Sequence, residues 1–389
     1  MLHALSAPHP RCAARRLTPH AIIATVAILA SATIAGSFAA ADPIDDPTVI
    51  VVATPEDGHP TRALVDAEGR IHLLFATAAG PRYSLSNAVT TPSAVPEFAA
   101  SIPVVAVDPD RPGLEYSDGD MALGRDGRVL VTLMTNAWKL KLPQEDWGYH
   151  LAELAPGAAS FAPVRNVNHR PSEGFSIAAD GDGRVAAVWL ADRLLGNVSV
   201  DDGQTFGPPT EIDRSFNPCN CCTTVTVPCG DGRFAVLYRE ETGNERDMHI
   251  AFWNPATDET SRQRISAAPW KISTCPMTYY DLRPAPGGFV AAWPNGDDYT
   301  VHFARLDGDG QLLPPGEVKT PGRSWHRHSV AAVPAADGGA LVVWNKDSRI
   351  GWQRYDPQGR PAGATDSAAT SGKGVAAVAL PDGRFVVFH

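Results

Sequence analysis

The sequence lacks the features that mark several large protein classes. Helical periodicity is nearly absent, and no nucleotide-binding loop, serine triad or zinc-protease spacing occurs. Basic runs are also missing, and acidic residues outnumber basic residues by 43 to 33, which disfavours nucleic acid and anionic membranes as partners. Aromatic residues make up only 8% of the 389 residues, whereas glycine and proline contribute 34 each. We therefore expect a globular chain rich in turns, with a large core.

A short phrase that returns seven times indicates the architecture. In each copy an apolar strand leads into a glycine turn and a second apolar strand follows, as in the runs that end at Trp189 and Trp344. The turns fall at Gly69, Gly127, Gly183, Gly232, Gly288, Gly339 and Gly383. A period of about 50 residues with room for four strands predicts an all-β fold, a β-propeller of six or seven blades.

The two ends of the chain are expected to share one blade. Most units add a third strand after the glycine turn, at residues 82–86, 147–154, 195–200, 247–253, 299–306 and 350–355. The last unit, residues 375–389, stops at its second strand. We expect residues 48–53 to complete it, because a shared blade closes the ring and removes an exposed sheet edge.

Residues 1–41 are predicted to be a signal peptide, and residues 42–389 a single propeller domain. Arg11, Arg15 and Arg16 precede an uncharged apolar run, 21–34, that is too short to span a membrane. Small residues before positions 40 and 42 offer cleavage after 39 or 41. The mature protein would be periplasmic or secreted, not inserted in a membrane, and strongly acidic, because residues 1–41 contain no acidic residue.

One motif is specific enough to suggest a family. Ser199, Asp201, Gly203, Thr205 and Phe206 match every defined position of the Asp-box, S-x-D-x-G-x-T-[W/F]. The chain resembles the Asp-box (BNR-repeat) sialidase superfamily, in which this box is structural. We expect a hairpin between the third and fourth strands of a blade, in which the carboxylate binds the amides of its own turn and the aromatic ring wedges between blades.

The resemblance also implies a glycoside hydrolase as an alternative function. Sialidases of this family use an arginine triad, an acid/base Asp and a Tyr–Glu nucleophile pair. The corresponding candidates are Arg62, Arg239, Glu240 and Tyr280, with Arg246, Glu241 and Tyr279 as further choices. None of them lies in a matching pattern, since the Arg-Ile-Pro motif of the family is reduced to Arg62-Ala63-Leu64. A hydrolase would therefore rest on the resemblance alone.

Sulfur and imidazole side chains recur at equivalent places in three consecutive units. When the units are aligned on their turn glycines, the set is Cys219, Cys221, Cys222, Cys275, Met277, His326 and His328. We expect these residues to enter the innermost strands at one mouth of the channel, where alternation points residues i and i+2 to the same side. Soft sulfur and imidazole donors suit copper, and zinc less well. Arg327 is a candidate for lowering a thiol pKa, and Phe216, Trp270 and Trp325 for shielding the site.

Disulfides are the competing interpretation, because they persist in an oxidising compartment. Five cysteines follow the signal peptide, so at least one is not in an internal disulfide. One example is a Cys219–Cys275 bridge with a vicinal Cys221–Cys222 link. Cys229 lies seven residues beyond Cys222, about 23 Å along a strand, so we expect it to be a separate thiol.

The sequence therefore predicts a periplasmic or secreted propeller that binds a soft metal, copper first, or acts through a redox-active thiol pair. A sialidase-type hydrolase and a disulfide-stiffened scaffold for another protein are the alternatives. The partner at the mouth would be a metal ion, a small ligand or a glycan. The charged phrase 238–253 is expected to form a polar hairpin with internal ion pairs, or to bring Arg239 to the mouth as an anion ligand.

Overall fold

The computed structural model describes residues 48–89, 95–106, 110–111, 113–215, 218–220, 222–267, 269–325, 327–370 and 372–389. The chain divides into two units, Met1–Ala40 and Ala41–His389, and the description that follows is of the second. The predicted signal peptide lies outside the described residues. Phe216, Cys221 and His326 also lie outside them.

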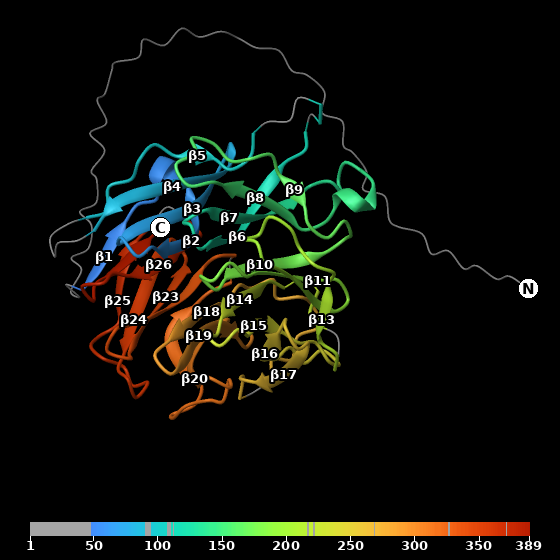
Figure 1. Ribbon diagram of the computed structural model, residues 1–389. Helices are drawn as coiled ribbons and strands as arrows, with labels where there is room; N and C mark the ends of the chain where they lie inside the picture. The colour runs from blue at the N-terminus through green and yellow to red at the C-terminus, as the bar shows by residue number, and fades with distance from the viewer. Residues whose placement is uncertain are drawn as a thin grey trace, which may run out of the picture. The chain divides into compact units, whose positions relative to one another are not determined.

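Seven sheets follow one another along the chain (Figure 1). The first three are β2 (His59–Val65), β3 (Arg70–Thr77), β4 (Gly80–Ala88), β5 (Ile102–Pro103); β6 (Tyr116–Leu123), β7 (Val129–Thr135), β8 (His150–Leu154), β9 (Arg165–Asn166); and β10 (Glu173–Ala179), β11 (Val185–Leu190), β12 (Leu194–Ser199), β13 (Thr210–Asp213). Two short 3₁₀ helices, η1 (Pro55–Asp57) and η2 (Gln144–Asp146), are the helices in the described residues.

The remaining four sheets repeat this pattern. They are β14 (Thr224–Pro228), β15 (Phe234–Arg239), β16 (Met248–Asn254), β17 (Glu259–Arg264); β18 (Asp281–Ala285), β19 (Gly288–Asn295), β20 (Thr300–Asp307), β21 (Val318–Arg323); β22 (Val330–Pro334), β23 (Ala340–Lys346), β24 (Arg349–Tyr355), β25 (Asp366–Ala369); and β26 (Ala376–Ala379), β27 (Phe385–Phe388), β1 (Val49–Val52). Six of the seven predicted turn glycines lie between the first and second strands of their blades, and Gly288 is the first residue of β19.

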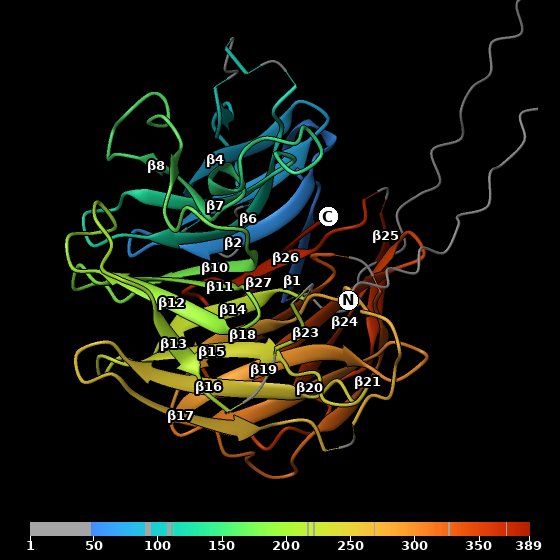
Figure 2. The same cartoon turned by 90° about the vertical axis from the view of Figure 1, so that its right-hand side faces the viewer.

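The innermost strands form a closed ring, so the fold is a seven-bladed β-propeller (Figure 2). Each innermost strand contacts the next in the order β2, β6, β10, β14, β18, β22 and β26, and β26 contacts β2. The prediction of a propeller is confirmed, and of the two expected blade numbers the structure has seven. Segments far apart in sequence therefore meet around one axis.

The first strand of the described chain completes the last blade, as predicted. β1 pairs with β27 in parallel, with Val49 opposite Phe385 and Val52 opposite Phe388. The amide of Thr54 extends the pairing by donating to the carbonyl of His389 at 2.9 Å. The two ends of the propeller thereby hold each other, and the second strand of the last blade has no open edge.

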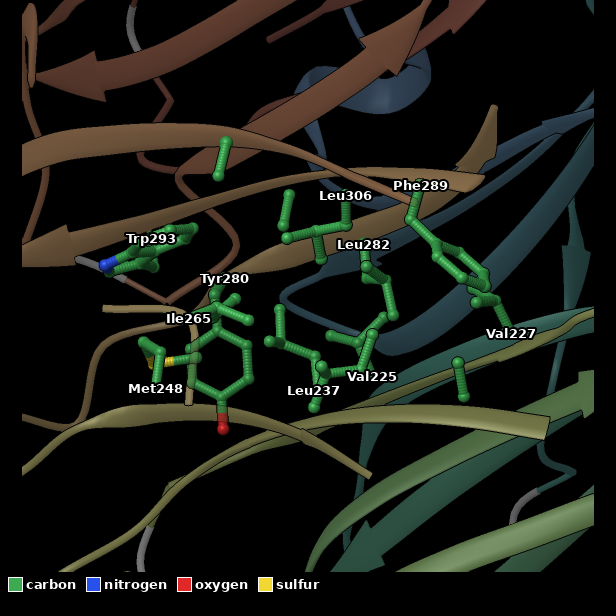
Figure 3. Close-up of a cluster of buried hydrophobic side chains, with 14 of the residues drawn as sticks. Val225, Val227, Leu237, Met248, Ile265, Tyr280, Leu282, Phe289, Trp293 and Leu306 are labelled. Carbon is green, nitrogen blue, oxygen red and sulfur yellow. The ribbon is translucent and has the colours of Figure 1, made fainter. Parts of the chain in front are cut away.

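Apolar side chains from both faces of each blade fill the spaces between blades. In β15, Leu237 packs towards the next blade with Leu282 and Trp293, whereas Val236 packs on the opposite side with Val188. Figure 3 shows the first of these clusters between the fourth and fifth blades. Because both faces are buried, the strands read as continuous apolar runs. Burying one such side chain contributes about 1.5–3 kcal/mol.

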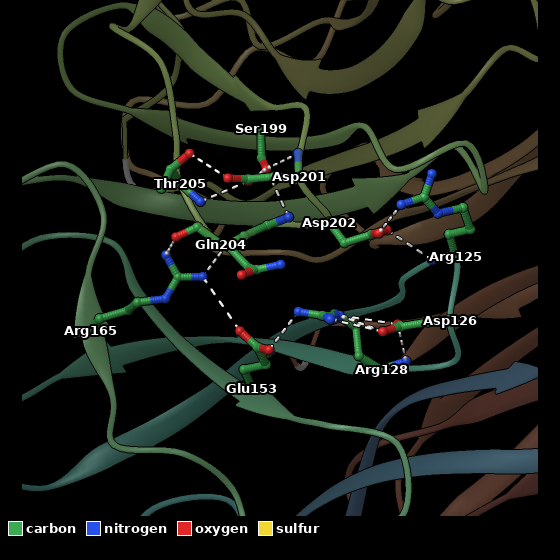
Figure 4. Close-up of polar contacts among 11 residues, drawn as sticks. Arg125, Asp126, Arg128, Glu153, Arg165, Ser199, Asp201, Asp202, Gln204 and Thr205 are labelled. Atoms are coloured by element: carbon green, nitrogen blue, oxygen red, sulfur yellow. Dashed lines mark hydrogen bonds and ion pairs between the residues drawn. The ribbon is translucent and has the colours of Figure 1, made fainter.

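The Asp-box forms the hairpin expected of it, between β12 and β13 (Figure 4). Asp201 accepts hydrogen bonds from the amide and hydroxyl of Thr205 at 2.8 and 2.6 Å, and Ser199 accepts from the amide of Gly203 at 2.8 Å. Gly203 has φ 83°, a left-handed conformation that suits glycine. Phe206 packs at the edge of the neighbouring interblade cluster.

Candidate thiol site and axial pocket

A pocket, called the axial pocket below, opens where the seven innermost strands begin. About 860 Å³ of space between its walls holds no protein atom. Its lining comes from all seven blades and includes Arg62, Asp120, Glu173, Cys222, Tyr279, His328 and Val375. The closed ring brings these residues together although they span more than 300 positions of the sequence.

Two arginines and two aspartates pair with one another in the channel. Arg62 lies 3.1 Å from Asp120 and 3.0 Å from Asp281, and Arg283 lies 3.0 Å from Asp281. Burial opposes the charge of Arg62, but the two carboxylates outweigh it and raise the Arg62 pKa. The pairs join strands β2, β6 and β18. We call these pairs the channel ion network. They neutralise the charge of Arg62, so the main role of Arg62 is to connect inner strands of different blades.

Three sulfur atoms meet beside the axial pocket, and we call them the sulfur cluster. The Sγ atoms of Cys219 and Cys222 are 3.2 Å apart, and each lies 3.8 Å from Sγ of Cys275. Their ligand atoms all lie within 4.8 Å of one another. Cys219 and Cys222 are each 3% exposed, and Cys275 is half-buried.

A tight turn brings Cys219 and Cys222 together. The amide of Cys222 donates to the carbonyl of Cys219 at 2.9 Å, which closes the turn. The amide of Cys219 donates to the carbonyl of Arg239 at 2.8 Å, so the turn is fixed to the end of β15. The two cysteines of the Cys-x-x-Cys sequence therefore lie in a turn that precedes β14. The turn, and not strand alternation, brings their side chains to the same side.

Two buried cations face Cys219. Nη1 of Arg246 donates to Sγ of Cys219 at 2.8 Å, while Nε of Arg246 donates to the carbonyl of Ile272 at 3.3 Å. Arg239 is fully buried, donates to the carbonyls of Arg246 and Pro294 at 2.9 Å, and lies 5.1 Å from the ring of Trp270. Arg239 thus supports the loop that carries Arg246 and adds a second positive charge.

The two thiols of the turn titrate very differently. The hydrogen bond from Cys222 is the largest influence on Cys219 and, with the charges of Arg246 and Arg239, lowers the Cys219 pKa to about 7 against the opposing effect of burial. The same hydrogen bond and burial raise the Cys222 pKa well above its ordinary value. Cys219 therefore ionises near neutral pH, whereas Cys222 keeps its proton. Thiol–disulfide exchange needs one thiolate to attack and a second thiol to follow.

Arg327 was one candidate for lowering a thiol pKa, but Arg246 and Arg239 are the cations that act on Cys219. Arg327 lies instead over the ring of Tyr279, 5.9 Å from its centroid, at the axial pocket. The alternative interpretation of residues 238–253, in which Arg239 binds an external anion, does not fit the structure, because its guanidinium is fully buried on carbonyl groups.

The predicted alternation did not extend to Met277 and His328. Both residues precede the strands, β18 and β22, and both have φ 48°, a left-handed backbone that breaks the period of two. The Met277 side chain is 47% exposed, and its amide donates to Sγ of Cys275 at 3.4 Å. The ring of His328 packs 4.2 Å from that of Tyr279, and burial lowers the His328 pKa to about 3.

The example disulfides are not formed. Cys219 and Cys222 are both thiols, so neither of the two example bridges is formed, whereas Cys275 is disulfide-bonded. Cys229 is a separate thiol at the other end of β14, as expected, and burial raises its pKa to about 12. Trp270 is buried against Arg239, whereas Trp325 is 38% exposed.

The hydrolase candidates are not arranged as a Tyr–Glu nucleophile pair. The hydroxyl of Tyr280 donates to the carbonyl of Thr223, and burial raises the Tyr280 pKa well above its ordinary value. Glu240 lies 3.1 Å from His249 and 3.7 Å from Arg262, within the polar hairpin expected for residues 238–253. Of the four candidates, Arg62 and Tyr280 line the axial pocket.

Sequence reasoning missed Arg283 and Asp281 in the channel and the specific pairing of Cys219 with Cys222. The Cys-x-x-Cys spacing was the available signal for the pair. The channel residues gave none, because an Arg or Asp in a strand is usually exposed. In the described part of the chain, no helix has the length and apolar character needed to cross a bilayer.

Comparison with known proteins supports the fold alone. No family model matches the chain, and no curated protein matches it. Similar solved structures include an ulvan lyase of polysaccharide lyase family PL25 bound to an oligosaccharide (12% identity, 85% of this chain and 90% of that chain, TM-score 0.54) and the WD40 repeats of RRP9 (9%, 85% and 87%, TM-score 0.50). A Hadza microbial sialidase matches at 12% identity over 80% of this chain and 65% of that chain, with a TM-score of 0.46. The neighbours have unlike activities, so the chain is a β-propeller whose function must be argued from its own site.

Proposed function

We propose that this protein performs thiol–disulfide exchange with small molecules through Cys219 and Cys222. The observation that carries the proposal is the 3.2 Å separation of their sulfurs together with the hydrogen bond from Arg246 to Cys219. A disulfide bond measures about 2.05 Å, so a shift of roughly 1 Å would join the pair. The closed turn already holds the two backbones at the spacing of a bridge.

Access and charge fit this activity. Cys222, but not Cys219, is among the residues that line the axial pocket. A small disulfide or thiol in the pocket would therefore meet the pair on the Cys222 side, whereas burial shields both sulfurs from large proteins. The low pKa of Cys219 supplies a thiolate near pH 7, and the thiolate is the attacking species in exchange. We further propose a periplasmic or secreted location, from the predicted signal peptide, and membership of the Asp-box propellers, from the box at Ser199–Phe206.

Reaction with the neutral reagent dithiodipyridine tests the proposal. The wild-type pair should release two equivalents of thiopyridone and keep no label, because the second thiol displaces the first adduct. The Cys222→Ser variant should release one equivalent at this site and retain a mixed disulfide on Cys219, while Cys229→Ser serves as the control and leaves the site unchanged. A stable label on Cys219 of the wild-type protein would contradict the proposal.

A soft-metal site is the second candidate. It requires reduced protein, because Cys275 is disulfide-bonded in the structure and only its thiolate would be a metal ligand. A metal–sulfur bond of about 2.3 Å separates ligand sulfurs by about 3.8 Å in a tetrahedral site and about 4.0 Å in a trigonal site. The 3.8 Å distances from Cys275 to Cys219 and Cys222 suit that spacing, and sulfur ligands favour copper(I). Titration with copper(I) against a competing chelator tests this candidate, with one equivalent bound by the wild type and none by the Cys219→Ser, Cys222→Ser double variant.

A further inference from the structure

A second hollow, called the basic groove below, adjoins the axial pocket. The hollow and its open mouth together hold about 560 Å³ free of protein atoms, and its walls include four basic side chains: His59, Arg327, His328 and Lys373. No carboxylate is among its lining residues. Thr61, Arg327 and His328 line both the groove and the axial pocket, so the two spaces are adjacent.

The two permanent cations of the groove have no counter-ion in the described part of the chain. Neither Arg327 nor Lys373 lies within 4.0 Å of a described carboxylate, although acidic residues are in excess. Arg62 and Arg283, deeper in the channel, are by contrast both paired with Asp281. Glu173 also lines the axial pocket. Burial raises the pKa of Glu173, and the charge of Arg327 offsets part of that rise. Unpaired cations in an acidic protein indicate a place for an anion from outside.

The walls also suit an organic ligand. Pro60 and Ala76 form apolar parts of the groove, and the ring of Tyr279, which lines the axial pocket, lies beside Arg327 and His328. A guanidinium binds a carboxylate through two parallel N–H donors, and an ammonium adds a point charge. Arg327 lines both hollows, so a carboxylate seated on Arg327 and Lys373 would lie beside the pocket that Cys222 lines.

We infer that the exchange partner of the Cys219–Cys222 pair is a small organic disulfide that carries carboxylates, bound by the basic groove. This inference rests on the proposed exchange function and adds the class of its substrate. The ionised sulfur of the pair displaces one half of the bound disulfide as a thiolate and forms a mixed disulfide. The second sulfur gives its proton to that thiolate and then displaces the other half. The protein loses two electrons to form the Cys219–Cys222 disulfide, and the substrate leaves as one thiol and one thiolate.

Three disulfides of similar size and different charge test the inference. They are dithiodipropionate, which is anionic, dithiodiethanol, which is neutral, and cystamine, which is cationic. Each rate with the reduced protein is divided by the rate with dithiothreitol, which removes intrinsic differences in reactivity. We expect the normalised rate of the anionic disulfide to exceed that of the neutral one by about tenfold or more at low salt, and cystamine to be slowest. Added salt should reduce the preference.

Two double variants with the same change in net charge test whether the groove cations cause the preference for the anionic disulfide. Arg327→Gln with Lys373→Gln should reduce the ratio of anionic to neutral rates to within about twofold, because both groove cations are removed. The control replaces Lys139 and Arg360, two exposed cations away from the pocket linings, by Gln and changes the net charge equally. The control variant should keep the preference. Equal ratios in the wild type, or an equal loss in both variants, would overturn the inference.

Suberate separates failure of the groove from failure of the exchange reaction. It is the carbon analogue of dithiodipropionate and cannot exchange, so calorimetry reports binding alone. We expect suberate to bind the wild type and the Cys219→Ser, Cys222→Ser variant alike, and not the Arg327→Gln, Lys373→Gln variant. Exchange without charge preference or suberate binding overturns the inference and leaves the proposed function intact. Suberate binding without any exchange overturns the proposed function and, with it, the disulfide substrate.

Discussion

Replacing Arg246 by Gln is expected to raise the Cys219 pKa, and the structure sets the size of the effect. Nη1 of Arg246 lies 2.8 Å from Sγ of Cys219 in a site that is 3% exposed at the cysteine. A hydrogen bond to a charged group contributes about 1.5–3 kcal/mol, and one pKa unit corresponds to about 1.4 kcal/mol. The variant should therefore shift the pKa upwards by about one to two units, from the value of about 7.

Alkylation by iodoacetamide measures this shift. The wild-type Cys219 is about half ionised at pH 7, whereas the variant would be about one-tenth to one-hundredth ionised. A thiolate of higher pKa is also more nucleophilic, with a Brønsted coefficient of about 0.4–0.5. The net rate at pH 7 should fall only about two- to sixfold, while the midpoint of the pH profile moves by the full shift. Peptide mapping by mass spectrometry assigns the label to Cys219.

Arg264→Gln is the matched control, because Arg264 lies on β17 and pairs with Asp247, away from the sulfurs. It should leave the Cys219 profile unchanged. An unchanged midpoint in Arg246→Gln, or an equal shift in both variants, would refute the assignment of the thiolate to the local guanidinium. The fold of each variant is checked by its thermal transition.

Three further predictions concern the framework. Asp201→Ala should lower the melting temperature by about 2–4 °C, since it removes the acceptor of the Thr205 amide and hydroxyl. The Asp201 pKa is lowered to about 2 in the folded protein. The difference in stability between the wild type and Asp201→Ala should therefore be complete above pH 3.8, the ordinary pKa of Asp, and vanish as pH falls through 2. Arg62→Met should cost about 3–5 kcal/mol in urea unfolding, because it leaves the carboxylate of Asp120 buried and uncompensated. Deleting residues 1–53 should lower the urea midpoint, because β27 would lose its parallel partner; an unchanged midpoint would contradict the role of β1.

The fold was predictable because its signals are local. The turn glycines and the apolar runs on either side of them specify each two-stranded core, and the incomplete unit at residues 375–389 implied a partner from the other end. β1 supplies that partner. Both inferences need only the period of a strand and the rule that exposed edges are avoided.

The site was predictable in composition but not in arrangement. The prediction applied strand alternation to segments that precede the strands. Met277 and His328 adopt left-handed backbones there, so the period of two no longer decides which way their side chains point. The pairing of Cys219 with Cys222 depends on a turn, and its cation, Arg246, comes from a loop 27 residues away. Contacts of that kind depend on how two loops pack, which no local pattern in the sequence specifies.

The most direct test of the account is a redox titration of the Cys219–Cys222 pair. The purified protein is equilibrated in buffers of graded thiol and disulfide, trapped by alkylation and mapped by mass spectrometry. The account predicts a single two-electron transition in which Cys219 and Cys222 lose their labels together while Cys229 remains labelled. Independent titration of the two cysteines, or a Cys219 that stays reduced at every potential, would contradict it.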